Sequence, residues 1–181
     1  MNTEKNATEV VFGTQEDGFH FKGLLASYDT VDRDNDIFLK GCFKEDIQNR
    51  ERHVLLYNHD KSLNSVIGYF DAKETERGVE IEGKFLDGDD LGNKIKNLVQ
   101  IGAFQTLSIG FGVEHEKDVN YQKERNGFDI KKAFIREGSI VITPANPNAT
   151  INVLKSVKAS IVKNTDEEEQ INKLKEEIKK I

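Results

Sequence analysis

The four histidines are the side chains best suited to proton transfer, because an unperturbed imidazole changes charge near neutral pH. They are His20, His53, His59 and His115. His59 differs from the others because it follows an apolar run, residues 54–57, and lies between two polar residues, Asn58 and Asp60. The end of a strand is a place where a rigid scaffold presents side chains to a site. His59 is therefore our candidate for a general base, provided that a partner lies near it.

Ser108 is the candidate for a nucleophile. It interrupts the apolar segment 106–112, in which Gly110 and Gly112 leave room for another backbone to approach closely. Most serines in strands bond only to backbone or water, and the Gly-x-Ser-x-Gly turn of the α/β-hydrolases is absent because Thr106 stands two residues before Ser108. A hydroxyl is a weak nucleophile until a neighbouring base takes its proton, so Ser108 depends on meeting an imidazole.

Glu137 places a carboxylate within the apolar run 134–141. Successive side chains of a strand alternate between its faces, so Arg136 does not neutralise Glu137 directly. The carboxylate is then either exposed at a rim or an orienting partner for an imidazole. His59, Ser108 and Glu137 follow one another at strand positions, but their spacing alone does not show whether they meet.

Neither a metal nor a cofactor is indicated. Asp32, Asp34 and Asp36 have the spacing of the first three ligands of a calcium-binding loop. However, Ile37 stands where that loop needs glycine, and Phe43 stands where it needs glutamate. We therefore expect a turn in which the aspartates bond to nearby backbone. A single cysteine also excludes a multi-cysteine zinc site.

The composition excludes several classes of protein. The 181 residues carry 32 acidic and 26 basic side chains, a formal net charge of -6, with both signs interspersed. Nucleic-acid binders usually cluster their lysines and arginines, so we expect no nucleic-acid partner. No run of about 18 apolar residues occurs, and the polar N-terminus lacks the apolar stretch of a signal peptide. These features predict an intracellular protein without a membrane span.

The elements that would position the candidate residues are mostly strands. Residues 19–24 and 79–85 alternate apolar and polar side chains, which is typical of a strand with one wet face. Further strands are expected at 54–57, 65–72, 106–114, 128–136, 139–143 and 150–154. This density predicts a mainly β fold, a small antiparallel β-barrel or strongly bent sheet with a few peripheral helices.

Two helices are expected within this β fold. Residues 89–101 place four apolar side chains on one face, and Gly102 follows as a stop signal. The four are Leu91, Ile95, Leu98 and Val99. A shorter helix is expected at 42–49.

The composition changes after Lys155, so we divide the chain into a domain at 1–155 and a linker with a short amphipathic helix at 156–181. The apolar seam of that helix consists of Ile171, Leu174, Ile178 and Ile181. It covers fewer than two heptads and is marginal alone. The helix either packs on its own domain or frays, or it serves homo-oligomerisation or scaffold docking.

Five blocks of the chain together resemble the prohead maturation proteases of tailed bacteriophages, a family similar in fold and chemistry to the herpesvirus assemblin proteases. Their order and spacing match the family over roughly residues 20–156. The blocks are 23–43, Asn58-His59-Asp60 with Ile67-Gly68, 78–83, Leu107-Ser108-Ile109-Gly110-Phe111, and Glu137-Gly138-Ser139-Ile140-Val141 with 144–149. Gly138 departs from the pattern, because the family usually has a β-branched residue there.

The resemblance implies an assemblin-like barrel and a serine endopeptidase without a cofactor. It would cleave scaffold segments, the major capsid protein and itself inside the immature phage capsid, in the host cytoplasm. The match implies Ser108 as nucleophile, His59 as general base and Glu137 as the third member of the triad.

Two alternatives stay open at this point. Ser139 is a rival nucleophile, because residues two apart on a strand share a face and Ser139 could lie beside Glu137. The alternative function is a non-catalytic capsid-assembly or scaffold-binding module with the same fold. For the oxyanion of a peptidase we expect the backbone amides of Ala145 and Asn146, since Pro144 has no N–H to donate.

Overall fold

The computed structural model describes residues 20–50 and 52–153, which are rich in strands. The strands are β1 (His20–Ser27), β2 (Ile37–Phe38), β3 (Arg52–Tyr57), β4 (Val66–Glu74), β5 (Gly78–Phe85), β6 (Leu107–Gly112), β7 (Val119–Gln122), β8 (Gly127–Ile130), β9 (Phe134–Ile140) and β10 (Thr150–Val153). The helices are α1 (Lys44–Asn49) and α2 (Asp90–Gln100), with short 3-10 turns η1 (Leu63–Ser65) and η2 (Glu116–Asp118). The expected mainly β fold is confirmed.

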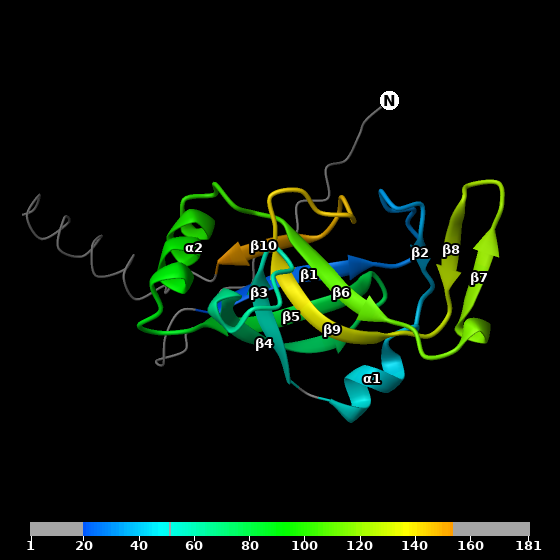
Figure 1. The fold of residues 1–181 in the computed structure, drawn as a ribbon, viewed down its shortest axis with the longest axis horizontal. Coiled ribbons are helices and arrows are strands. Elements are labelled where there is room, and N and C mark those ends of the chain that lie inside the picture. The colour runs from blue at the N-terminus through cyan, green and yellow to red at the C-terminus, as the bar shows by residue number, and fades with distance from the viewer. Residues whose placement is uncertain (1–19, 51, 154–181) are drawn as a thin grey trace, which may run out of the picture. The chain divides into compact units, whose positions relative to one another are not determined.

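The main sheet has seven strands in the order β10-β1-β5-β4-β3-β9-β6. It curls so that its two edges meet, because a bridge joins Thr106, just before β6, to Thr150 of β10. Two backbone hydrogen bonds reinforce this closure, from Leu107 N to Ala149 O at 3.2 Å and from Ile151 N to Gln105 O at 3.0 Å. The sheet therefore forms a small barrel (Figure 1). Its pairs are antiparallel except that β3 and β9 run parallel.

A second sheet of three strands, β2-β8-β7, accounts for the main error in the predicted strands. The segment 128–136, expected as one strand, belongs partly to β8 and partly to β9, which lie in different sheets. The chain turns between them because Lys131 N donates to Asp118 O at 2.7 Å and Ala133 N donates to Cys42 O at 2.8 Å. The expected strands 128–136 and 139–143 also leave Glu137 in the gap between them, whereas β9 runs through that residue.

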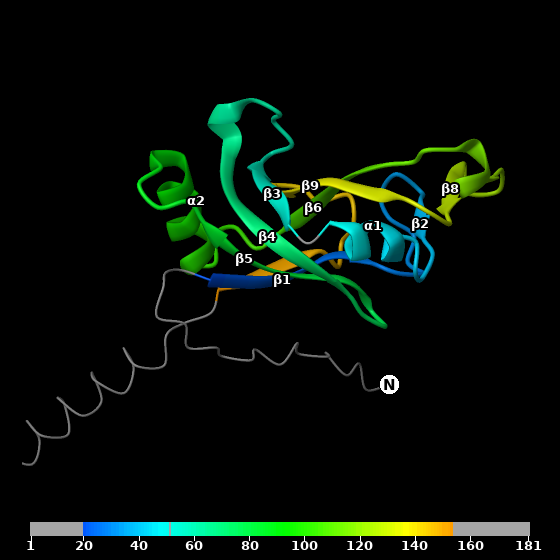
Figure 2. The same ribbon diagram turned by 90° about the horizontal axis from the view of Figure 1, so that it is seen from below.

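Both helices occur where the sequence predicts them. The Asp89 side chain caps α2 by accepting a hydrogen bond from Gly92 N, and Ile95 and Val99 are buried against the barrel. Gly102 follows the helix with φ +76, a conformation that glycine adopts easily. Figures 1 and 2 show α2 at one end of the barrel and the three-stranded sheet at the opposite end.

The barrel interior is filled by large apolar side chains, including the fully buried Phe21, Leu25 and Phe70. Gly138 of β9 faces this core, and a Cβ there would lie 2.7 Å from the Phe70 ring and 3.1 Å from Leu25. A larger residue at this position would collide with the Phe70 ring, which occupies the space that its side chain would need.

The aspartate turn has the expected local bonding. Asp32 Oδ1 accepts hydrogen bonds from the backbone amides of Asp34 and Asp36, both at 2.9 Å. The linker and helix predicted for 156–181 lie outside the described residues. Within the described ranges, no helix combines the length and the apolar character that crossing a membrane requires.

Candidate active site

His59 and Glu137 meet at the end of β3. The distance between His59 Nδ1 and Glu137 Oε1 is 2.7 Å, within hydrogen-bonding range. The Glu137 side chain is only 7% exposed, whereas the His59 side chain is 41% exposed. The parallel register sets Tyr57, the last residue of β3, opposite Ile140, and the left-handed turn at Asn58 and His59 then brings His59 back toward Glu137. A buried carboxylate thus holds one nitrogen of an imidazole whose ring is open to solvent.

Ser139 connects the same two residues by a second route. Its Oγ donates to Glu137 Oε2 at 2.6 Å and accepts a hydrogen bond from His59 N at 3.1 Å. Ser139 is fully buried, at 0% exposure. Both carboxylate oxygens of Glu137 are therefore occupied, one by the ring of His59 and one by the hydroxyl that holds the His59 backbone. This bonding explains how a carboxylate is tolerated inside a β-strand.

Ser108 lies directly opposite Ser139 in the antiparallel pair of β6 and β9. Side chains of directly opposed residues project to the same face, with Cβ atoms about 4.5–5.5 Å apart. Ser108 therefore shares the face on which Ser139 contacts Glu137 and His59. Among the hydrogen bonds of the described residues, none joins Ser108 Oγ to His59. The structure thus brings all three candidate residues into one neighbourhood and forms the His59–Glu137 contact.

Gly110 provides the space for the Glu137 carboxylate. The two residues are paired across β6 and β9, and a Cβ on Gly110 would lie 2.0 Å from Glu137 Oε1. The glycines of this segment were expected to leave room for another backbone. At Gly110 the neighbour is instead the Glu137 carboxylate, and the signal in the sequence was a glycine two residues after Ser108.

The backbone at the end of β3 turns sharply to present His59. Asn58 and His59 both have left-handed conformations, with φ 56 and φ 58. Each such residue costs roughly 1–2 kcal/mol relative to the right-handed region. The strain is held in place because Asn58 N donates to Ile140 O at 2.9 Å and His59 N donates to Ser139 Oγ. Unfavourable backbone maintained by surrounding bonds is a feature often found at functional sites.

The loop after β9 contains the two residues expected to bind an oxyanion. The Asn146 side chain is buried and donates from Nδ2 to Ser27 Oγ at 2.8 Å. Arg33 holds the loop from outside, because its backbone N donates to Ala145 O at 3.0 Å and its guanidinium donates to Pro144 O. The backbone N–H groups of Ala145 and Asn146 have no acceptor among the described residues. The link from Ser27 to Asn146 was not predicted from the sequence.

No group of three or more His, Cys, Asp or Glu residues within 20–50 and 52–153 is arranged to hold a metal ion. The side chains that meet in this neighbourhood supply a hydroxyl, an imidazole and a carboxylate. An imidazole oriented by a carboxylate and lying near a serine is an arrangement suited to acyl transfer.

Phage proteins show similarity over most of this chain. The prohead protease of Enterobacteria phage HK97 is 30% identical over 152 residues, which cover 83% of this chain and 66% of the relative. The probable capsid maturation protease of Lactococcus phage p2 is 29% identical over 158 residues, covering 82% of this chain and 80% of the relative. The chain thus spans slightly less than two thirds of the HK97 protein.

A solved structure and a family model complete the comparison. The structure of the KSHV protease in complex with a hexapeptide phosphonate inhibitor matches with a TM-score of 0.48 and 9% identity, covering 75% of this chain and 64% of the other. A model described as Caudovirus prohead serine protease matches residues 5–168. Because this match includes most of the 181 residues, the chain belongs to the family of caudovirus prohead serine proteases.

Proposed function

We propose that this chain is a serine endopeptidase of capsid maturation with Ser108 as nucleophile, His59 as general base and Glu137 as the residue that orients His59. The observation that carries the proposal is the contact of 2.7 Å between His59 Nδ1 and Glu137 Oε1, on the face that Ser108 shares. The Nδ1–H group of His59 donates a hydrogen bond to the carboxylate, and Nε2 is then the ring nitrogen that is free to accept a proton.

In the first step, Ser108 Oγ attacks the carbonyl carbon of the scissile peptide bond while His59 Nε2 takes the hydroxyl proton. The resulting imidazolium is stabilised by the buried Glu137 carboxylate. When the tetrahedral intermediate collapses, the C–N bond breaks and Nε2 returns the proton to the leaving amine. Water then hydrolyses the acyl-enzyme by the same sequence, with His59 again accepting and returning one proton.

The negative oxygen of the tetrahedral intermediate needs preorganised donors. We assign this role to the backbone amides of Ala145 and Asn146, which have no acceptor among the described residues. The buried bond between Asn146 and Ser27 and the contacts of Arg33 support this assignment, because they hold the loop in one conformation. A loop that is already fixed before substrate arrives loses little conformational entropy during the reaction.

Ser108 is favoured over Ser139 as the nucleophile. Ser139 is fully buried and its proton is already directed to Glu137, whereas Ser108 retains 6% exposure. The role of Ser139 in this proposal is to hold His59 and Glu137 in place. It is a positioning residue that contacts no substrate.

The substrates we propose are scaffold segments, the major capsid protein and the protease itself, cleaved within the immature capsid in the host cell. The phage relatives named as a prohead protease and a probable capsid maturation protease support this choice. Confinement inside a capsid raises the effective concentration of enzyme and substrate, so a low intrinsic affinity suffices.

Co-expression with the capsid protein of the same phage tests the proposal. The wild-type chain should generate new capsid-protein termini, detectable by mass spectrometry of intact fragments, and Ser108→Ala should generate none. Ser139→Ala removes the neighbouring hydroxyl and leaves the proposed nucleophile, so it should still generate the new termini, with a rate lowered by a modest factor because His59 and Glu137 lose a positioning contact. If the wild-type chain promotes assembly without any new termini, the non-catalytic alternative is correct.

A further inference from the structure

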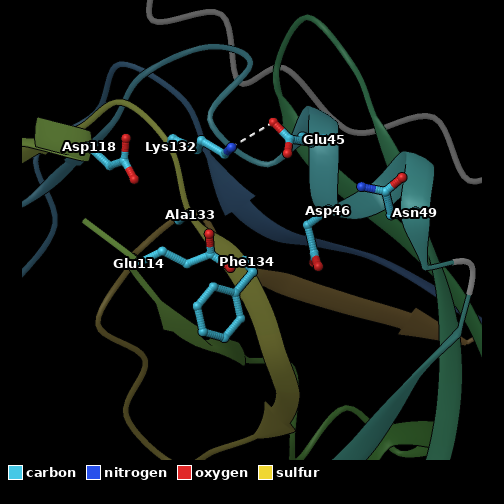
Figure 3. Close-up of a pocket in the computed structure, with 8 residues that line it drawn as sticks. All are labelled: Glu45, Asp46, Asn49, Glu114, Asp118, Lys132, Ala133 and Phe134. Atoms are coloured by element: carbon cyan, nitrogen blue, oxygen red, sulfur yellow. Dashed lines mark ion pairs between the residues drawn. The ribbon is translucent and has the colours of Figure 1, made fainter.

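A second polar site lies beside the start of β9, outside the residues of the proposed triad. It is a cavity of about 100 Å³ between α1, the segment after β6 and the turn that precedes β9. Figure 3 shows Glu45 and Asp46 reaching toward it from α1, with Glu114 and Asp118 on the facing side. We call this cavity the acidic pocket.

The charges around the acidic pocket are not balanced. Lys132 supplies the cation among its lining residues, and its Nζ lies 2.7 Å from Glu45 Oε2. Asp46 is also satisfied, because its Oδ2 accepts from Ile135 N at 2.8 Å. Neither Glu114 nor Asp118 forms an ion pair with another described residue. The hydrogen bond to Glu45 is the main cause that raises the pKa of Lys132, and the charges of Glu45, Asp118 and Glu114 raise this pKa further.

Asp118 is the residue of the acidic pocket with a buried carboxylate oxygen that lacks a hydrogen-bond donor among the described residues. Its side chain is 7% exposed, and the buried Oδ2 has no hydrogen-bond partner among the described residues. Burying a carboxylate oxygen without a donor costs free energy, and native structures rarely leave such an atom unsatisfied. Asp118 lines the cavity, so its carboxylate borders the space that an entering donor would occupy (Figure 3).

The rest of the lining indicates the shape of that donor. Ala133 and the ring of Phe134 form an apolar wall next to the carboxylates. A long basic side chain has matching parts, because its methylene stem packs on apolar surface while its charged end donates several hydrogen bonds. The carboxylates are not arranged to hold a metal ion, which leaves an organic cation as the better match.

We propose that the acidic pocket binds the charged end of a lysine or arginine side chain of a bound polypeptide, with Asp118 and Glu114 as its acceptors. That the polypeptide is a substrate segment rests on the proposed function, whereas the affinity of the pocket for a basic side chain does not. The pocket would anchor a segment through one basic residue while another part of that segment reaches Ser108.

A titration followed by NMR tests the proposal with the full chain carrying Ser108→Ala, which prevents self-cleavage. The probe is Nα-acetyl-lysine methylamide, and the matched control is Nα-acetyl-norleucine methylamide, which has the same stem without the charge. The lysine compound should shift the amide signals of Asp118 and Ala133 to saturation. Asp118→Asn should weaken its binding by about tenfold or more, since a hydrogen bond to a charged group is lost.

Two further variants sharpen the test. Glu114→Gln, at an exposed position, should weaken binding by a smaller factor and keeps the test available if Asp118→Asn does not fold. Lys132→Met should strengthen binding several-fold, because it removes a competing cation and frees Glu45. Equal chemical-shift changes with the norleucine compound would overturn the proposal. Unchanged affinity for the lysine compound in both Asp118→Asn and Glu114→Gln would also overturn it, and so would displacement of the lysine compound by equimolar calcium. Absence of cleavage by the wild-type chain would refute the proposed function alone, because the titration does not depend on activity.

Discussion

Replacement of Gly110 by alanine is expected to abolish most of the activity while leaving the barrel folded. The new Cβ would lie 2.0 Å from Glu137 Oε1, whereas ordinary contacts of a Cβ begin near 3.4 Å. Oε1 must therefore move by about 1.4 Å. The distance from Oε1 to His59 Nδ1 is 2.7 Å, and hydrogen bonds of this kind extend only to about 3.2 Å. The required shift exceeds that margin, so His59 loses its orienting partner.

The size of the effect follows from what the carboxylate does. Removing the orienting acid of a Ser-His-Asp triad lowers turnover by about 10⁴-fold, because the imidazole no longer holds the productive tautomer. We expect Gly110→Ala to lower turnover by about 10²–10⁴-fold. The loss in free energy of unfolding should be only about 1–3 kcal/mol, because the obstructing atom is at the end of a side chain and one charge-assisted hydrogen bond is broken.

The assay is cleavage of the capsid protein, with Glu137→Ala and the double variant measured beside Gly110→Ala. Without the carboxylate there is nothing for the new methyl group to displace, so Gly110→Ala should cost less than about threefold in the Glu137→Ala background. Nitrogen-15 NMR of His59 gives a readout independent of activity, since Gly110→Ala should end the preference for a proton on Nδ1. A folded Gly110→Ala protein with wild-type cleavage would refute the role of Glu137, and an equal loss in both backgrounds would show that Gly110 acts through another residue.

Three further outcomes are expected. Ser108→Ala and His59→Ala should each lower turnover by about 10⁴-fold or more in a peptide-cleavage assay, with the double variant little worse than either, and additive losses would contradict a single catalytic unit. Burial lowers the pKa of His53, so at mildly acidic pH the unfolded chain binds a proton at this imidazole more readily than the folded chain does. The free energy of unfolding, measured in urea, should therefore fall as the pH drops below about 6.5, and this dependence should be shallower in His53→Phe. Burial, followed by the charge of Glu74, raises the pKa of Cys42, so this thiol should react with iodoacetamide only when the protein unfolds, and rapid labelling of the folded protein would contradict the packing.

Local patterns were sufficient to predict several elements. Alternation over residues 79–85 identified β5, and the apolar face and the stop at Gly102 identified α2. The aspartate turn at residues 32–36 was also predicted, because a short acidic side chain bonds to backbone only a few residues away. All these features depend on interactions between residues close in sequence.

The candidate site depends on pairings between strands far apart in sequence, and no local pattern specifies such a register. The sequence identified His59, Ser108 and Glu137 as candidate residues and, through the family resemblance, their roles. The parallel pairing of β3 with β9, together with the left-handed turn at Asn58 and His59, brings His59 to Glu137, and the antiparallel register of β6 with β9 sets Ser108 opposite Ser139. A slip of one residue would turn these side chains to the other face of the sheet.

The same reason explains the errors. Residues 128–136 read as one strand because their composition suits a strand throughout, and only hydrogen bonds to distant Asp118 and Cys42 divide them between two sheets. Glu137 fell between the two expected strands because a buried carboxylate is unfavourable in a strand unless it forms hydrogen bonds. Its partners, His59 and Ser139, become neighbours only when the barrel has formed, so tertiary structure alone decides that this carboxylate is buried.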